Sequence, residues 1–328
     1  MRTRTLHSVV PAALILGLTL AACSAPDDEE AASDETRVVA TDQGDVEIPA
    51  DPQRVVVLNY ALAGYLYDLD VPVDAMIPED TEGEGVFSDY WADDAEAAGT
   101  EFIPWSPDGF DMQAILDLDP DLIIAGGVGF PLFQATEAYD DLSDIAPTVI
   151  VSGDKTTWQQ QYEFLATEVF DQPQAYDDAV AEYDARLAEV RDEITVPDGE
   201  SVFMSLTVDL TPYVLIEDQG LPTVFSELGF TPAPLFATGA YEPYTPGGDS
   251  FTLSTEQVGQ VIDQENVFVL GFNGAPVDVE TLEANPVWAA LPAFASGQAH
   301  DLPYYVYRGD FDETMELLDV VEEMFATA

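Results

Sequence analysis

The chain has 328 residues and an extreme charge balance, with eight basic residues against 64 acidic ones and a net charge of −56 at pH 7. This balance argues against nucleic acid as a partner, because phosphate binding needs clustered lysine and arginine. The length and a hydrophobic fraction of 47% exclude disorder over most of the chain and leave room for two cores. We interpret the acidity as an adaptation to salty surroundings, where ions screen the self-repulsion.

Residues 1–22 have the features of a bacterial export signal. Arg2 and Arg4 provide a basic start, and residues 9–20 form an apolar run that is short for a membrane span. The run ends in Leu20-Ala21-Ala22-Cys23, which resembles a lipobox. The resemblance implies cleavage before Cys23, a diacylglycerol on its thiol and a fatty acyl group such as palmitate on its amine. The alternative is an ordinary secretory peptide with a cysteine there by chance.

Cys23 is the only cysteine of the chain, so we expect no disulfide and no cysteine-bound metal. Residues 23–36 are small and acidic without periodicity, which predicts a tether.

Residues 37–157 alternate strand and helix patterns and are predicted to form an N-terminal α/β lobe. Strands are expected within 37–48, around a turn at 42–45, and at 55–58, 71–77, 122–125 and 148–151. Helices are expected at 60–69 and 111–118, and a loop at 79–106. The continuous apolar runs of the later strands indicate a parallel sheet covered on both faces.

Residues 158–194 form the predicted bridging segment. Large apolar residues recur there every three or four positions, as on one side of a helix. Pro173 interrupts the pattern, with Asp171 placed to cap a second helix of about 33 Å at ~1.5 Å per residue. Such a helix is either a stiff strut between two lobes or an outer helix of a single α/β domain.

Residues 195–328 repeat the alternation and are predicted to form a C-terminal α/β lobe. Strands are expected at 202–206, 213–216 and 267–270, and helices at 221–228, 278–291 and 312–325. A capping box at Ser254-Thr255-Glu256-Gln257 begins a further helix that reaches residue 262. Two similar lobes therefore explain the chain better than one large sheet.

Several phrases, in order, carry a resemblance that spans nearly the whole chain after the leader. They are IPADPQRVVV at 48–57, FDMQAI at 110–115 running into DPDLII at 119–124, IAPTV at 145–149, LSTEQV at 253–258 and WAALPAF at 288–294. Together they resemble the periplasmic-binding family of ABC importers for iron chelates and vitamin B12. The resemblance implies two α/β lobes with central, mostly parallel sheets, one long rigid helix joining them, a ligand cleft between them and small closure on binding.

In this family each lobe presents an acidic residue to arginines of the membrane permease. The resemblance assigns this role to Glu256 in the C-terminal lobe, where the residue also faces a helix dipole. The N-terminal phrase usually carries a glutamate at the position of Gln113, so we expect Asp111 or Asp117 to substitute for it.

The ligand site is predicted from the rule that ligands lie beyond the carboxyl ends of the strands in open α/β sheets. Tyrosine offers a flat apolar face and one hydroxyl, which suit the hydrocarbon and amide rim of a chelate. Packing is the alternative role for Trp158, which belongs to the helical stripe, and for Tyr305 or Tyr307, which alternate as in a strand. The predicted ligand-binding residues are Tyr60, Trp105, Phe130, Trp158, Tyr213, Tyr241, Tyr244, Tyr304, Tyr307 and Arg308.

Arg308 is the expected hydrogen-bond donor to oxygen atoms on a chelated ferric ion. It lies beside the predicted cleft, and its alternative role is a salt bridge to Asp310 or Asp312. A tri-anionic catecholate complex would require several cations, so neutral or cationic ferric hydroxamates fit this acidic chain better.

Rival functions are weighed by the side chains they need. A zinc or manganese carrier is set aside because His300 is the one histidine after the leader. Heme, cobalamin, or a bare ferric ion held by phenolates such as those of Tyr304 and Tyr305 stay open. A lipid-anchored hydrolase would need a nucleophile elbow, a zinc-binding histidine pair or a phosphate loop, and none is present.

We therefore predict a monomeric binding protein without enzymatic activity and without an intrinsic cofactor. Its ligand is a ferric siderophore, and its partners are an ABC permease with its ATPase. It is expected at the extracytoplasmic face of the bacterial cell membrane, anchored through Cys23.

Overall fold

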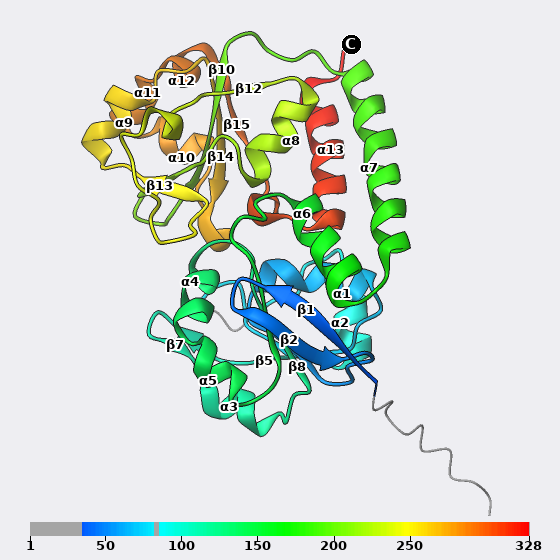
Figure 1. Ribbon diagram of the computed structural model, residues 1–328. Helices are drawn as coiled ribbons and strands as arrows, with labels where there is room; N and C mark the ends of the chain where they lie inside the picture. The colour runs from blue at the N-terminus through cyan, green and yellow to red at the C-terminus, as the bar shows by residue number, and fades with distance from the viewer. Residues whose placement is uncertain (1–34, 82–84, 328) are drawn as a thin grey trace, which may run out of the picture. The chain divides into compact units, whose positions relative to one another are not determined.

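The computed structural model describes residues 35–81 and 85–327 (Figure 1). The predicted signal peptide, Cys23 and residues 23–34 of the predicted tether lie outside them. In the described ranges no helix is both long and apolar enough to cross a membrane. Two α/β lobes, each with its own sheet, follow one another along the chain, with the long helix α7 at their side. The predicted fold class is confirmed.

The N-terminal lobe is built on five parallel strands in the order β5-β4-β3-β8-β9. Val55 and Val57 of β3 pack in one core and Val56 in another, so the sheet is buried on both faces. This burial explains the continuous apolar runs from which the sequence predicts four of the five strands. The strands are β3 (Val55–Val57), β4 (Val73–Met76), β5 (Glu101–Phe102), β8 (Leu122–Gly126) and β9 (Thr148–Val151).

The remaining elements of this lobe were only partly foreseeable. The first hairpin and two helical segments lie where predicted: β1 (Thr36–Thr41) with β2 (Gly44–Pro49), η1 (Tyr60–Leu62) with α1 (Ala63–Asp68), and α3 (Met112–Asp117). The sequence missed α2 (Ala92–Ala98), α4 (Phe130–Glu137), α5 (Tyr139–Ser143), and the pair β6 (Trp105–Ser106) and β7 (Gly109–Phe110). In α2 only Ala95 is buried, so the segment shows no apolar stripe and was expected as loop.

The bridging segment consists of α6 (Trp158–Glu163), the π-helical turn η2 (Phe164–Val169) and α7 (Pro173–Glu193). A capping box of Thr157 and Gln160 begins α6. The expectation that Asp171 caps α7 is wrong: the cap position is Gln172, and Asp171 has a left-handed backbone with φ of 56°. The 21 residues of α7 correspond to about 32 Å. Tyr183 and Val190 are buried, so the side of α7 that carries them packs against the rest of the protein.

The C-terminal lobe contains a sheet in the order β13-β11-β10-β14-β15, with β12 also paired to β10. Strands β10, β12, β14 and β15 pair in parallel, whereas β11 and β13 add an antiparallel edge. The strands are β10 (Glu200–Leu206), β11 (Pro212–Leu215), β12 (Thr231–Pro232), β13 (Ser250–Thr252), β14 (Asn266–Gly271) and β15 (Ala299–Asp301).

Three helices of this lobe match the sequence, and two expectations are corrected. Helices α8 (Gly220–Leu228), α9 (Thr255–Val261) and α13 (Phe311–Phe325) lie as predicted, and the capping box at Ser254 is formed. The helix expected at 278–291 is broken at Asn285, whose extended backbone and capping side chain begin a new helix. Residues 304–308 form a 3₁₀ helix, not a strand. The remaining elements are η3 (Phe236–Thr238), η4 (Phe272–Gly274), α10 (Val279–Glu283), α11 (Pro286–Ala289), α12 (Pro292–Ser296) and η5 (Tyr304–Arg308).

Side-chain hydrogen bonds join the lobes directly at the beginning of α13, and we call this group the lobe latch. Its three bonds are Trp91 Nε1 to Asp310 Oδ2 at 3.0 Å, Ser88 Oγ to Glu313 Oε1 at 2.6 Å, and Tyr90 Oη to Tyr305 Oη at 2.9 Å. Asp310 also caps α13, with Glu313 completing a capping box. A Cβ at Gly64 would lie 1.8 Å from Asp310 Oδ2, so only glycine fits beneath the latch.

Candidate functional site

A cavity of about 260 Å³ lies between the lobes. Asn59 follows β3, Glu79 follows β4 and Phe130 follows β8 in the N-terminal lobe, while Phe272 follows β14 in the C-terminal lobe. The cavity therefore occupies the carboxyl ends of the strands, which is where ligands bind in open α/β sheets. Seven of its 19 lining residues are aromatic, and the wall also contains a few charged side chains.

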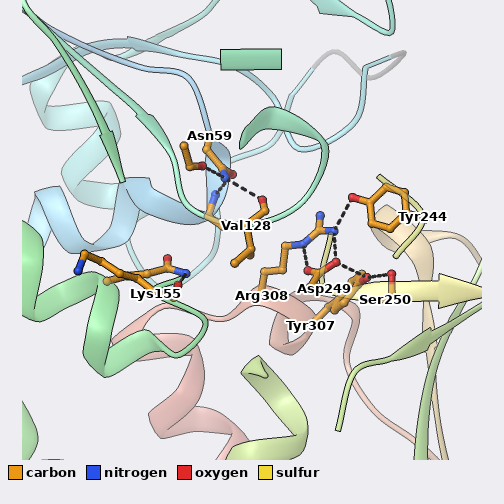
Figure 2. A network of polar contacts seen from close by, with 11 residues as sticks. Asn59, Val128, Lys155, Tyr244, Asp249, Ser250, Tyr307 and Arg308 are labelled. Carbon is orange, nitrogen blue, oxygen red and sulfur yellow. Dashed lines mark hydrogen bonds and ion pairs between the residues drawn. The ribbon is translucent and has the colours of Figure 1, made fainter. Parts of the chain in front are cut away.

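Arg308 of η5 is the one basic side chain among the described residues that line the cavity, and its charge is already paired (Figure 2). Its Nε lies 2.5 Å from Asp249 Oδ2 and its Nη2 lies 2.9 Å from Asp249 Oδ1, a two-pronged ion pair. The same Nη2 donates to the Tyr244 hydroxyl at 3.3 Å. The predicted alternative partners, Asp310 and Asp312, are not the ones used. Within the described residues Nη1 has no hydrogen-bond partner.

The guanidinium is held rigidly from several sides. The ring of Tyr307 lies 4.5 Å from Arg308 Cζ, and the Tyr307 hydroxyl contacts Asp249 Oδ1 at 3.1 Å and Ser250 Oγ at 2.9 Å (Figure 2). Burial alone would lower the pKa of Arg308, but Asp249 and its neighbours together raise that pKa above its ordinary value. The group therefore stays charged at any physiological pH.

The loop after β8 approaches this arginine closely. Gly129 has φ of 83°, and a Cβ there would lie 2.8 Å from Arg308 Nη2. Asn59 fixes the loop by donating from Nδ2 to the Gly126 carbonyl at 2.6 Å and to the Val128 carbonyl at 3.3 Å (Figure 2). Position 129 therefore requires glycine, both for its positive φ and because a side chain there would collide with Arg308.

Aromatic rings form one wall of the cavity. Trp105 and Phe130 come from the N-terminal lobe, with ring centroids 6.3 Å apart. Tyr244 and Phe272 come from the C-terminal lobe, and both rest on Tyr213 at 5.6 Å and 5.1 Å. These flat apolar surfaces suit the organic shell of a ligand and leave few places for strong polar contacts.

Carboxyl groups and tyrosines line another part of the cavity. Burial raises the pKa of Glu79 to about 7, although Arg308 opposes the shift. Burial, with Asp310 nearby, also raises the pKa of Glu313. Asp80, Tyr60 and Tyr304 lie in the same lining. In the described residues no group of three or more His, Cys, Asp or Glu side chains is arranged to hold a metal ion.

The structure brings six of the ten predicted ligand residues to the cavity: Tyr60, Trp105, Phe130, Tyr244, Tyr304 and Arg308. The other four lie elsewhere. Trp158 packs edge-on against Tyr183 at 5.0 Å, Tyr213 supports the aromatic wall from behind, Tyr241 stacks on Phe251 at 4.4 Å, and Tyr307 is buried beneath Arg308.

The acids of the cavity are not among the residues predicted from the sequence. Glu79 and Asp80 follow β4, so the rule of the strand ends covers them, but the sequence predicts residues 79–106 only as a loop. Glu313 lies in the first turn of an amphipathic helix, and its pattern gives no sign that it faces a cavity.

The predicted docking residues lie at the beginnings of two helices, one in each lobe. Asp111 caps α3, and Gln113 donates from Nε2 to Asp117 Oδ1 at 2.6 Å. Glu256 lies exposed in the first turn of α9. Figure 1 shows α3 and α9 in different lobes, both away from α7.

Comparisons with known proteins place the fold among solute-binding proteins. The family described as "Periplasmic binding protein" matches residues 55–306. The ferric enterobactin-binding periplasmic protein FepB of Escherichia coli is 27% identical, over 96% of this chain and 97% of its own. The iron(3+)-hydroxamate-binding protein FhuD of Bacillus subtilis is 29% identical, over 74% of this chain and 73% of its own. The crystal structure of holo-ViuP has a TM-score of 0.73 at 20% identity and covers 89% of this chain and 95% of its own, a likeness of fold.

Proposed function

The chain belongs to the periplasmic binding protein family, and from this premise we propose that it captures a ferric siderophore of the hydroxamate type for an ABC importer. The two curated relatives named above support the general class, since both are named for binding a ferric chelate. Both are also named as binding proteins, which agrees with the expectation that this chain is not an enzyme. The ligand arrives as a finished chelate, so the protein supplies a shaped cavity and no cofactor of its own.

The charge of the cavity wall is the observation that carries the choice of hydroxamate. Among the described residues the wall holds one arginine, and Asp249 already neutralises it at 2.5 Å and 2.9 Å. Glu79, Asp80 and Glu313 add three carboxyl groups. A ferric tricatecholate would bring three negative charges into this setting and would meet no unpaired cation in the described part of the lining. A neutral ferric trihydroxamate meets no such repulsion, and its iron-bound oxygens can accept from Arg308 Nη1.

A bare ferric ion is disfavoured by the tyrosines that would have to bind it. Burial raises the pKa of Tyr304 and of Tyr305, which opposes the phenolate form that iron requires. The Tyr305 hydroxyl is also engaged with Tyr90 at 2.9 Å.

Delivery and anchoring belong to the same proposal. We assign docking on the permease to Glu256 and, in the other lobe, to Asp111 beside Gln113. The exposed positions of Glu256 and Asp111, at the beginnings of α9 and α3, support this assignment, because neither residue lines the cavity. Cys23 would hold the protein to the outer face of the cell membrane through its lipid. Cys23→Ala should abolish incorporation of labelled palmitate, and equal labelling of both proteins would refute the anchor.

The test of the ligand is a fluorescence titration of the purified protein. Trp105 lines the cavity, so a ferric chelate should quench its emission on binding. The panel contains a ferric trihydroxamate, a ferric tricatecholate, ferric citrate, heme and cobalamin. We expect saturable binding of the trihydroxamate at the lowest concentration, and Trp105→Phe should remove most of the signal without removing binding by equilibrium dialysis. Tighter binding of the tricatecholate would overturn the choice of hydroxamate.

A further inference from the structure

Glu79 is a carboxyl group in the cavity wall without a hydrogen-bond partner among the described residues. It follows strand β4 and lines the cavity, yet its carboxylate makes no hydrogen bond or ion pair within the described part of the chain. Its backbone is fixed from the other lobe, because Asn273 donates from Nδ2 to the Glu79 carbonyl at 3.4 Å. A half-buried acid held in place without a partner is costly unless a guest supplies the positive charge.

Two tyrosines, Tyr60 and Tyr304, lie near enough to this carboxyl group for its charge to raise their pKa. Tyr60, Tyr304 and Tyr305 line the same cavity. The Tyr60 hydroxyl donates to the Val86 carbonyl at 3.0 Å, and the Tyr305 hydroxyl accepts from Tyr90 at 2.9 Å. With two hydroxyls engaged by the protein, these residues offer mainly ring surface to a guest. Aromatic rings beside a carboxylate form a favourable environment for an alkylammonium ion.

The other charges of the cavity do not compete for this role. Arg308 is paired with Asp249, and Glu313 accepts from Ser88 Oγ at 2.6 Å and completes the capping box of α13. Asp80 lies next to Glu79 and adds negative charge. Glu79 is therefore the acid best placed to receive a cation, and its pKa of about 7 lets it ionise when a cation approaches.

Building on the proposed function, we propose that the preferred ferric hydroxamate carries a protonated primary amine on an alkyl arm and that Glu79 selects it. The arm lies along Tyr60 and Tyr304, and the ammonium group pairs with the Glu79 carboxylate. The iron-bound oxygens face Arg308. The cavity thus recognises a ligand that has a neutral ferric hydroxamate core and one positively charged arm.

The experiment compares two ligands that differ only in that charge. One is a linear ferric trihydroxamate that ends in a primary amine, and the other is the same chelate with the amine acetylated. At low salt and pH 8 the parent protein should bind the amine form about tenfold more tightly, a difference of about 1.4 kcal/mol. Equal affinities in the parent protein would overturn the inference without any variant.

The variants assign the effect to one residue. Glu79→Gln should bring the ratio of the two affinities to about one, whereas Glu280→Gln, an exposed acid on α10 outside the cavity, should keep it. A ratio that survives Glu79→Gln would refute the assignment. If neither chelate binds the parent protein, the proposed function itself fails. If both bind equally, only this inference fails.

Discussion

Replacing Arg308 by glutamine tests the polar centre of the site. The substitution keeps part of the length and one donor but removes the charge and the ion pair with Asp249. A hydrogen bond from a charged group to the iron-bound oxygens contributes about 1.5–3 kcal/mol. Its loss should weaken the binding of a ferric trihydroxamate roughly 10- to 150-fold, at about 1.4 kcal/mol per decade.

The same substitution also has a cost in stability, which must be separated from the loss of affinity. The side chain of Asp249 is 9% exposed, so the variant leaves a buried carboxylate unpaired, at a cost of about 3–5 kcal/mol. Arg308→Gln combined with Asp249→Asn removes both charges and should recover most of the melting temperature but not the affinity. Fluorescence titration and thermal unfolding measure the two effects on the same samples. A single variant that binds as tightly as the parent protein at low salt would show that Arg308 is only a structural partner of Asp249.

Three further predictions follow from the latch and the docking helices. Burial raises the pKa of Asp310 to about 7, so above about pH 4 the folded state binds more protons than the unfolded state. The melting temperature should therefore fall as the pH rises from 5.5 to 8. A rise over this range would contradict the prediction. Gly64→Ala places a Cβ against Asp310 and should cost about 1–3 kcal/mol in urea unfolding. Gly259→Ala on α9 is the control, because a Cβ there meets only Val287 Cγ1 at an ordinary contact distance of 3.9 Å and should cause no comparable loss. Glu256→Arg should abolish uptake in cells and leave ligand affinity intact; normal uptake would remove Glu256 from the docking surface.

The fold was predictable where strands are buried on both faces of the sheet, because such strands have a continuous run of apolar residues. Strands β3, β4, β8 and β9 are buried on both sides, so their sequences are apolar throughout and stand out without alignment. Helix α2 has one buried residue, and the break before α11 depends on the backbone of Asn285. Such features are decided by tertiary contacts that a local pattern does not record.

The site was predictable in position but not in detail. The rule of the strand ends led to the cavity, because all parallel strands end at the same edge of a sheet. The direction of each side chain depended on local geometry: η5 is a 3₁₀ helix, which turns Tyr304 to the cavity and buries Tyr307. The partner of Arg308 is Asp249, 59 residues away, whereas sequence proximity suggested Asp310 or Asp312.

The lobe latch has a consequence for the direction of transport. The three hydrogen bonds of the latch join the two lobes beside the cavity, so we expect capture to require little ordering of its walls. The same rigidity makes unloading the harder step. Separating the lobes would break the latch, at about 1 kcal/mol for each bond, and in the proposed function this work comes from the permease bound to both lobes. Under the proposed function the protein would therefore bind its ligand by diffusion and release it only at the ATP-driven permease.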